Sequence, residues 1–176
     1  AGVGCEMDSI LEIAEHHGVA VVEDNALGLF GKYKGGYLGT FGCLGGLSFN
    51  ALKSFNCGEG GALLVNDPRY IERAEIIRDF GTNRSRFLRG EVDEYTWVDL
   101  GSSYLLSDIL AAFLYAQLEA RDRIQAKRFR MWKYYFEHLR SWAQDCDAKL
   151  PFVPAYCEQS CDLFYLLMAS LQERQA

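Results

Sequence analysis

The sequence predicts an α/β protein in which a mostly parallel sheet is flanked by helices. Residues 8–17 have the periodicity of an amphipathic helix, and a short apolar run at 19–22 follows directly. A helix that leads straight into a buried strand is typical of parallel α/β sheets. Residues 47–50 and 62–65 look like two more strands, and a helical pattern over 107–143 predicts the longest helix.

The individual elements begin and end at recognisable residues. Gly18 is the stop signal of the first helix. The run 19–22 is rich in β-branched residues, as expected for a strand covered on both faces. Asp67-Pro68 predicts a helix start, because aspartate caps free N–H groups and proline fits the first turn. Gly81 is expected to end that helix, and the polar and aromatic residues 82–100 are expected to form a loop.

The C-terminal third contains the longest helix and then changes character. The helix starts at Ser107-Asp108, and Pro151 and Pro154 indicate a linker after it. The apolar run 163–168 predicts a strand. The long helix carries basic residues that could bind nucleic acid or phosphate, but the interleaved apolar residues favour a solvated helix face. These basic residues are Arg121, Arg123, Lys127, Arg128, Arg130 and Lys133.

Composition and charge exclude several classes of protein. The 176 residues are 49% hydrophobic and 24% charged, which fits one globular domain. A net charge of −6 argues against a sequence-independent nucleic-acid binder, and no apolar run approaches the roughly 20 residues of a membrane span. The six cysteines form no C-x-x-C pair and the three histidines show no ligand spacing. We therefore expect no metal, no disulfide framework and a reduced, cytoplasmic location.

Lys53 is the most informative single residue. It ends the stretch 48–53 and precedes the glycine-rich run 58–61, while Asp24 follows the apolar run 19–22. Taken alone, an acid at a strand end is more often a helix cap or a surface charge, and a lysine beside glycines is more often solvated. The functional interpretation of Asp24 and Lys53 therefore depends on their order along the chain. An acid at a strand end, a serine and a lysine before a glycine loop are the parts that a pyridoxal 5'-phosphate (PLP) site needs. The lysine joins the cofactor aldehyde, the acid keeps the pyridine nitrogen protonated, and hydroxyl and N–H groups hold the phosphate.

Several separated motifs, in the right order, carry a family resemblance. They resemble the sugar-nucleotide aminotransferases of the DegT/DnrJ/EryC1/StrS family. The segments concerned are 21–26 (VVEDNA), 39–42 (GTFG), 48–53 (SFNALK) and 58–63 (GEGGAL). Within that family, three more segments resemble the dTDP-4-amino-4,6-dideoxygalactose transaminases: 78–85 (RDFGTNRS), 95–99 (YTWVD) and 101–108 (GSSYLLSD).

The resemblance implies a fold, a reaction and an assembly. The fold is that of PLP-dependent transferases of fold type I, with an incomplete, aspartate-aminotransferase-like large domain over 1–150. Residues 151–176 are then a linker and the start of a small C-terminal domain, and the chain is expected to be a central fragment of a longer protein. The implied reaction transfers an amino group from L-glutamate to a dTDP-linked 4-keto-6-deoxy sugar nucleotide. Its product serves cell-surface polysaccharides such as lipopolysaccharide or enterobacterial common antigen, and a homodimer with sites at its interface is implied.

The resemblance also assigns roles to individual residues, with PLP as the cofactor and no metal. Lys53 becomes the catalytic lysine, Asp24 the partner of the pyridine nitrogen, and Ser48 a phosphate ligand. Ser103 occupies the place of an asparagine that reaches the phosphate of the neighbouring subunit's cofactor, although it could equally be a loop or capping residue. Leu27 stands where the family usually has glutamine and could pack on the cofactor ring.

Alternatives follow from the departures from the family pattern. Leu27 and Asn50, which replaces the usual histidine or serine, keep open a truncated or degenerate non-catalytic copy. A sugar-nucleotide 3-dehydratase relative would carry a histidine at the lysine position, and Lys53 argues against it. The loop 82–95 contains three arginines that either approach the substrate diphosphate or form an exposed basic loop.

Overall fold

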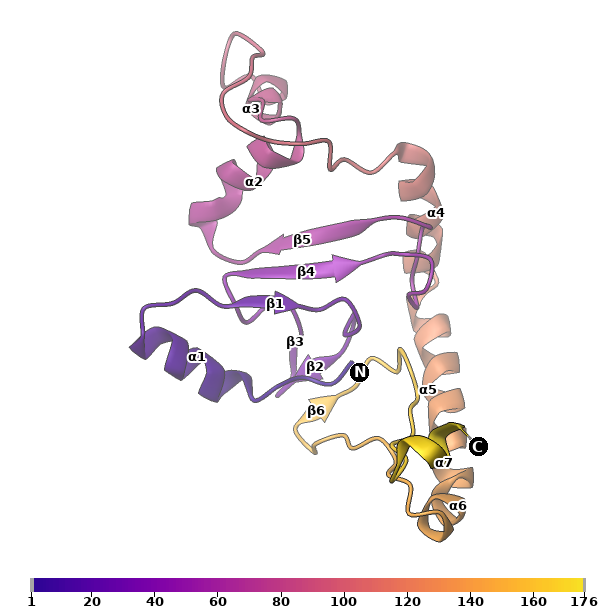
Figure 1. Ribbon diagram of the computed structural model, residues 1–176. Helices are drawn as coiled ribbons and strands as arrows, with labels where there is room; N and C mark the ends of the chain where they lie inside the picture. Colours follow the sequence, from indigo (N-terminus) through magenta and orange to yellow (C-terminus); the bar gives the residue numbers. More distant parts are fainter. Residues whose placement is uncertain (1, 176) are drawn as a thin grey trace.

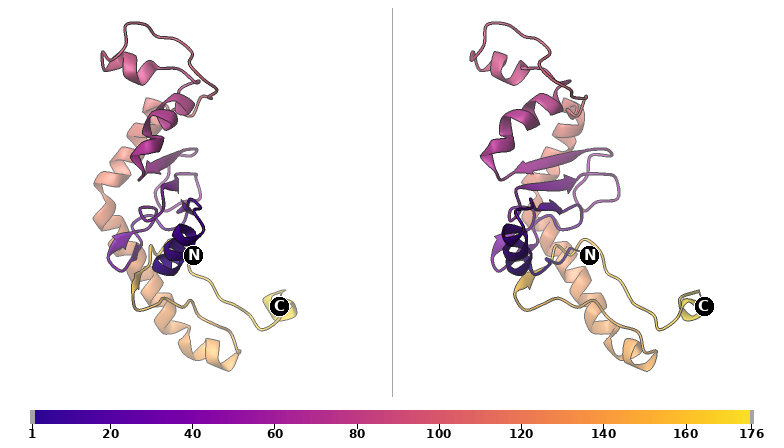
Figure 2. Two further views of the ribbon diagram at one scale, coloured as in Figure 1. Left: turned by 90° about the vertical axis from the view of Figure 1, so that its left-hand side faces the viewer. Right: turned by 60° about the vertical axis from the view of Figure 1, so that its left-hand side comes forward.

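The computed structural model describes residues 2–175, which form helices around two small sheets (Figure 1). The helices α4, α5 and α6 follow one another almost without a break and extend past the sheets in every view (Figure 1 and Figure 2). In chain order, the elements are α1 (Met7–His16), β1 (Val22–Asp24), β2 (Lys32–Tyr33), β3 (Gly36–Tyr37), β4 (Leu44–Ser48), β5 (Gly61–Val65), a 3₁₀ turn η1 (Pro68–Tyr70), α2 (Ile71–Arg78), α3 (Arg84–Leu88), α4 (Asp108–Glu119), α5 (Arg121–His138), α6 (Arg140–Asp145), β6 (Cys157–Glu158) and α7 (Leu171–Gln175).

The first sheet has the strand order β1-β4-β5 and contains the expected parallel pairing. β1 runs parallel to β4, with Asp24 opposite Gly46, whereas β5 is antiparallel to β4. The second sheet, β3-β2-β6, is antiparallel throughout. Because β6 pairs with β2, Glu158 lies opposite Lys32, and the C-terminal part of the chain returns to the N-terminal half.

Three of the predicted strands differ from expectation. The strand expected at 47–50 is β4, which spans Leu44–Ser48 and leaves Phe49 and Asn50 outside it. The strand expected at 19–22 is found at Val22–Asp24, and the Val19 and Val22 side chains are 59% and 63% exposed. The Val19 N–H donates to the carbonyl of Ala14 in α1 at 2.9 Å, so Val19 is still part of the helix end. β1 pairs along one edge only, with β4. The strand expected at 163–168 is also wrong: this stretch makes a single bridge, between Leu167 and Lys149. An apolar run becomes a strand only where a neighbouring edge can pair with its backbone.

The predicted helix ends are mostly confirmed. Gly18 follows α1 with a φ of 62°, the left-handed conformation that favours glycine. The Asp67 side chain accepts from the Arg69 N–H at 3.0 Å, and the chain enters α2 through a 3₁₀ turn that starts at Pro68. α2 ends at Arg78, three residues before Gly81, and the loop 82–100 contains the short helix α3.

The long helix is present as the three segments α4, α5 and α6, and Ser107 caps its start by accepting from the Leu110 N–H. Five of the six basic residues named above are exposed, as expected. Arg128 is the exception. Its side chain is 30% exposed and its Nε donates to the Cys161 carbonyl at 3.2 Å, so it belongs to the packing between α5 and the C-terminal segment.

Two groups of buried side chains form the core. One joins α1 to the second sheet through Met7, Tyr33, Leu38 and Cys157. The other consists of Phe49, Phe55, Cys57 and Leu114 and joins the β4–β5 connection to α4. This second cluster fixes the connection that contains Lys53, because Phe55 is only 1% exposed. Within residues 2–175, no helix is both long and apolar enough to cross a bilayer.

Candidate active site

The carboxyl ends of β1 and β4 form one edge of the first sheet. Asp24 is the last residue of β1 and Ser48 the last of β4, and the two strands are parallel neighbours. One carboxylate oxygen of Asp24 accepts from the Ala26 N–H at 3.1 Å, which leaves the other free of protein donors among residues 2–175. This edge is where open α/β sheets bind ligands.

Glu23 organises the loop beside this edge. Successive strand residues point to opposite faces, so Glu23 and Asp24 serve different sides of the sheet. The Glu23 carboxylate accepts from the backbone N–H groups of Gly39, Phe41 and Gly42 at 2.7, 2.7 and 2.8 Å. It therefore closes the turn between β3 and β4. The sequence analysis did not predict this role of Glu23. The features that could have indicated it are an acid directly before Asp24 and the glycines at 39 and 42.

Lys53 lies in a tight turn that Asn50 shapes. The Lys53 N–H donates to the Asn50 carbonyl at 2.9 Å, and the Asn50 side-chain oxygen accepts from the Leu52 N–H at 3.1 Å. The Asn50 amide in turn donates to Glu59 in the glycine-rich run at 3.0 Å. Such bonds from an asparagine side chain to the backbone two residues on are typical of turns. Asn50, which stands where the family usually has histidine or serine, thus shapes the turn that contains Lys53.

The Lys53 turn is also held from α4. The side chain of Gln117 donates to the Asn56 carbonyl at 2.6 Å and accepts from the Asn56 N–H at 3.2 Å. A side-chain amide that satisfies both backbone groups of one residue fixes that residue in place. No motif in the sequence indicated Gln117, because it lies 61 residues from Asn56.

Lys53, Asp24 and Leu27 line one cavity of about 510 Å³. Its other walls include the chain start at 2–5 and Val21. The volume lies within the roughly 300–1,000 Å³ of small-molecule sites. Lys53 is half-buried, and within residues 2–175 its amine makes no hydrogen bond or ion pair. Lys53 and Asp24 thus line one cavity with apolar residues such as Val21, and with Glu23 and Asn25. An amine and a carboxylate in one cavity suit an aromatic cofactor with a cationic ring nitrogen.

Ser48 and Ser103 are not among the residues that line this cavity. The Ser48 Oγ accepts from the Asn50 N–H at 3.4 Å, at the base of the Lys53 turn. Ser103 is exposed and bridges Asp79 in the backbone pairing that precedes α4. The phosphate role of Ser48 and the intersubunit role of Ser103 stay predictions.

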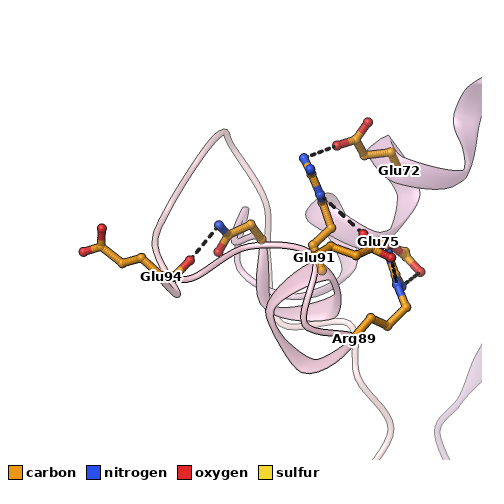
Figure 3. A network of polar contacts seen from close by, with 7 residues as sticks. Glu72, Glu75, Arg89, Glu91 and Glu94 are labelled. Carbon is orange, nitrogen blue, oxygen red and sulfur yellow. Dashed lines mark hydrogen bonds and ion pairs between the residues drawn. The ribbon is translucent and has the colours of Figure 1, made fainter.

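The three arginines of the loop 82–95 all contact carboxylates. Arg84 lies 3.4 Å from Asp79, and Arg86 lies 3.1 Å from Glu72. Figure 3 shows Arg89 beside Glu75 and Glu91, at 2.8 and 2.6 Å. Their charges are therefore partly balanced by acids of α2 and of the loop itself.

We expect the pair between Arg89 and Glu91 to hold the end of α3 in a pH-dependent way. Arg89 lowers the pKa of Glu91 below its ordinary value of 4.5. A lowered pKa means that the pairing contributes fully above pH 4.5 and is lost as the pH falls through the depressed value. Hydrogen-exchange protection of residues 84–91, relative to intrinsic rates, should fall in Arg89→Ala and, at acidic pH, in the unmodified protein. Equal protection in Arg89→Ala at neutral pH would contradict this, and Arg123→Ala, an exposed change on α5, is the control.

Comparison with known proteins places the chain among aminotransferases. TlmJ from Streptoalloteichus hindustanus, a solved aminotransferase structure, superposes with a TM-score of 0.82 at 26% identity. The match covers 99% of this chain and 46% of that one. The fold is thus that of aminotransferases of fold type I, of which the described residues form a part.

The chain belongs to the DegT/DnrJ/EryC1/StrS aminotransferase family, whose profile matches residues 1–174. EpsN of Bacillus subtilis, assigned as a pyridoxal phosphate-dependent aminotransferase, is 37% identical over 78% of this chain. GDP-perosamine synthase of Escherichia coli O157:H7 is 32% identical over 81% of it. The matches span 34% and 37% of these two relatives, so the chain corresponds to about a third of their length.

Proposed function

We propose that this protein transfers an amino group to a sugar nucleotide with PLP as its cofactor. The observation that carries the proposal is that the Lys53 amine, the Asp24 carboxylate and Leu27 line the same cavity at the carboxyl end of β1. Membership of an aminotransferase family supports it. When bound, PLP supplies an aldehyde that captures amines and a ring that accepts electrons.

Each chemical task falls to a residue of this chain. The Lys53 amine anchors the cofactor, because Lys53 lines the cavity and its amine makes no hydrogen bond or ion pair within residues 2–175. The Asp24 carboxylate holds the proton on the ring nitrogen by a charge-assisted hydrogen bond. With the cofactor bound, the Lys53 amine would serve as general base and acid, taking a proton from the Cα of the amino donor and giving it to the cofactor carbon C4′. The Leu27 side chain excludes water from the ring face, and Ser48 donates to the phosphate.

The finer proposal concerns substrates and assembly. We propose a dTDP-linked 4-keto-6-deoxy sugar as the acceptor and L-glutamate as the donor, in cell-surface polysaccharide biosynthesis. It rests on the resemblance of segments 78–85, 95–99 and 101–108. We further propose a cytoplasmic homodimer in which Ser103 reaches the second copy's cofactor. Residues 1–150 are assigned to the large domain and 151–176 to the linker and the start of the small one.

The substrate proposal is tested with a panel of nucleotide sugars. The PLP-loaded protein is incubated with ¹⁵N-labelled L-glutamate and either dTDP-4-keto-6-deoxyglucose or GDP-4-keto-6-deoxymannose, and labelled amino sugar is measured by mass spectrometry. We expect label in the dTDP-linked product, and replacing glutamate by glutamine should lower the rate. Label in the GDP-linked sugar alone would overturn the choice of nucleotide, and no label in either would overturn the proposed acceptor class.

A further inference from the structure

The turn that contains Lys53 is tied to the C-terminal segment of the chain. The Ser54 N–H donates to a carboxylate oxygen of Asp162 at 3.2 Å, and the Ser54 hydroxyl donates to the same oxygen. The Asp162 side chain is only 10% exposed. A nearly buried carboxylate that accepts two bonds from the residue next to Lys53 restrains the backbone on which Lys53 stands.

Asp162 is itself held by α5. Arg128 lies 3.8 Å from the Asp162 carboxylate and donates to the carbonyls of Asp162 and Cys161. Gln125, one turn earlier on α5, donates to the Ser160 carbonyl at 3.3 Å. These side chains hold the backbone of 160–162 against α5. The Asp162 carboxylate that binds Ser54 therefore has a fixed position.

The same segment also contacts two residues that line the cavity. The Ser160 hydroxyl donates to the Leu27 carbonyl at 2.6 Å, and the Ser160 N–H donates to the Gly2 carbonyl at 2.9 Å. Ser160 is 3% exposed, and both Leu27 and Gly2 line the cavity with Lys53. Residues 160–162 therefore contact both the residue next to Lys53 and two cavity-lining residues, Leu27 and Gly2.

Cys161, between these two contact residues, has a φ of 56°. Residues with a side chain seldom adopt this left-handed conformation, and they keep it where surrounding contacts hold them. Cys161 is 7% exposed, so the bend is buried. The bend lets Ser160 and Asp162 face two different partners.

We propose that Asp162 is a positioning residue for Lys53, and that residues 160–162 hold Lys53, Leu27 and Gly2 in fixed relative positions around the cofactor cavity. The inference rests on the proposed function, since it assumes that Lys53 anchors the cofactor. It adds that the chain's own C-terminal segment, 108 residues from Ser54, sets the geometry of that amine. Asp162 contacts neither cofactor nor substrate in this account.

The test compares Asp162→Ala with Asp162→Asn in the purified protein. Asparagine keeps an oxygen that can accept from the Ser54 N–H, whereas alanine keeps none. We measure hydrogen exchange of the Ser54 amide without cofactor, and the dissociation constant for PLP by absorbance titration. We expect Asp162→Ala to speed the exchange and to weaken PLP binding about tenfold, as for a lost buried hydrogen bond, with most of the affinity restored by asparagine. Asp145→Ala, an exposed change at the end of α6, should match the unmodified protein.

The outcomes separate this proposal from the proposed function. Wild-type affinity and exchange in Asp162→Ala would overturn the positioning role while leaving the function of Lys53 intact. A cofactor absorbance band that persists in Lys53→Ala would instead overturn the proposed function, whatever Asp162 does. If Asp162→Ala does not fold, Ser54→Ala carries the test. It removes the hydroxyl bond alone and should weaken PLP binding about threefold, and unchanged binding would overturn the proposal.

Discussion

Replacing Lys53 by alanine is expected to abolish covalent cofactor attachment and to lower the transamination rate by about 10²–10⁴-fold, the usual worth of a positioned proton-transfer group. Because the amine contacts no protein group within residues 2–175, the free energy of unfolding should change by less than about 0.5 kcal/mol. The visible absorbance band of lysine-bound cofactor and the rate with the keto-sugar nucleotide are measured together.

The matched control for this change is Lys127→Ala. Lys127 is an exposed lysine on α5, far along the chain from the cavity residues, and its removal should leave both the band and the rate unchanged. If Lys53→Ala kept the band while Lys127→Ala lost it, the assignment of the anchoring lysine would be wrong.

Glu23→Ala is expected to destabilise the protein by about 3–5 kcal/mol. The carboxylate accepts from three backbone N–H groups, of Gly39, Phe41 and Gly42. Each bond to a charged acceptor contributes about 1.5–3 kcal/mol, and part of the loss is offset by water reaching the half-buried loop. Urea denaturation measures the change directly.

Two further variants sharpen the Glu23 experiment. Glu23→Gln keeps one acceptor oxygen and should fall between the unmodified protein and alanine. Glu15→Ala, an exposed change on α1, should cost little. A cost below about 1 kcal/mol for Glu23→Ala would contradict the view that this carboxylate closes the β3–β4 turn.

Local signals explain which features could be predicted from the sequence. The glycine stop after α1, the Asp67 cap and the Ser107 cap depend on neighbours within a few residues, and all are present. The strand β5 was recognisable because it is an apolar run beside a glycine-rich connection, whereas the prediction at 47–50 contained only the last two residues of β4. The order of Asp24 and Lys53 along the chain also indicated that they would meet, since strand ends gather at one edge of a parallel pair.

Long-range partners explain what could not be predicted. Gln117 meets Asn56 across 61 residues and Asp162 meets Ser54 across 108, and such contacts leave no periodicity in the chain. The same holds for strands: residues 163–168 are as apolar as β5, but only Leu167 finds a pairing partner. Arg128 looked like one basic residue among six until the fold brought the Cys161 carbonyl beside it.

The central claim is that the Lys53 amine carries the cofactor, and chemical trapping tests it most directly. The PLP-loaded protein is reduced with borohydride, digested, and its peptides are weighed by mass spectrometry. We expect the phosphopyridoxyl mass on Lys53 alone, within the peptide that spans the Asn50 turn. The same mass on another lysine with Lys53 unmodified, or no stable adduct at saturating PLP, would contradict the account.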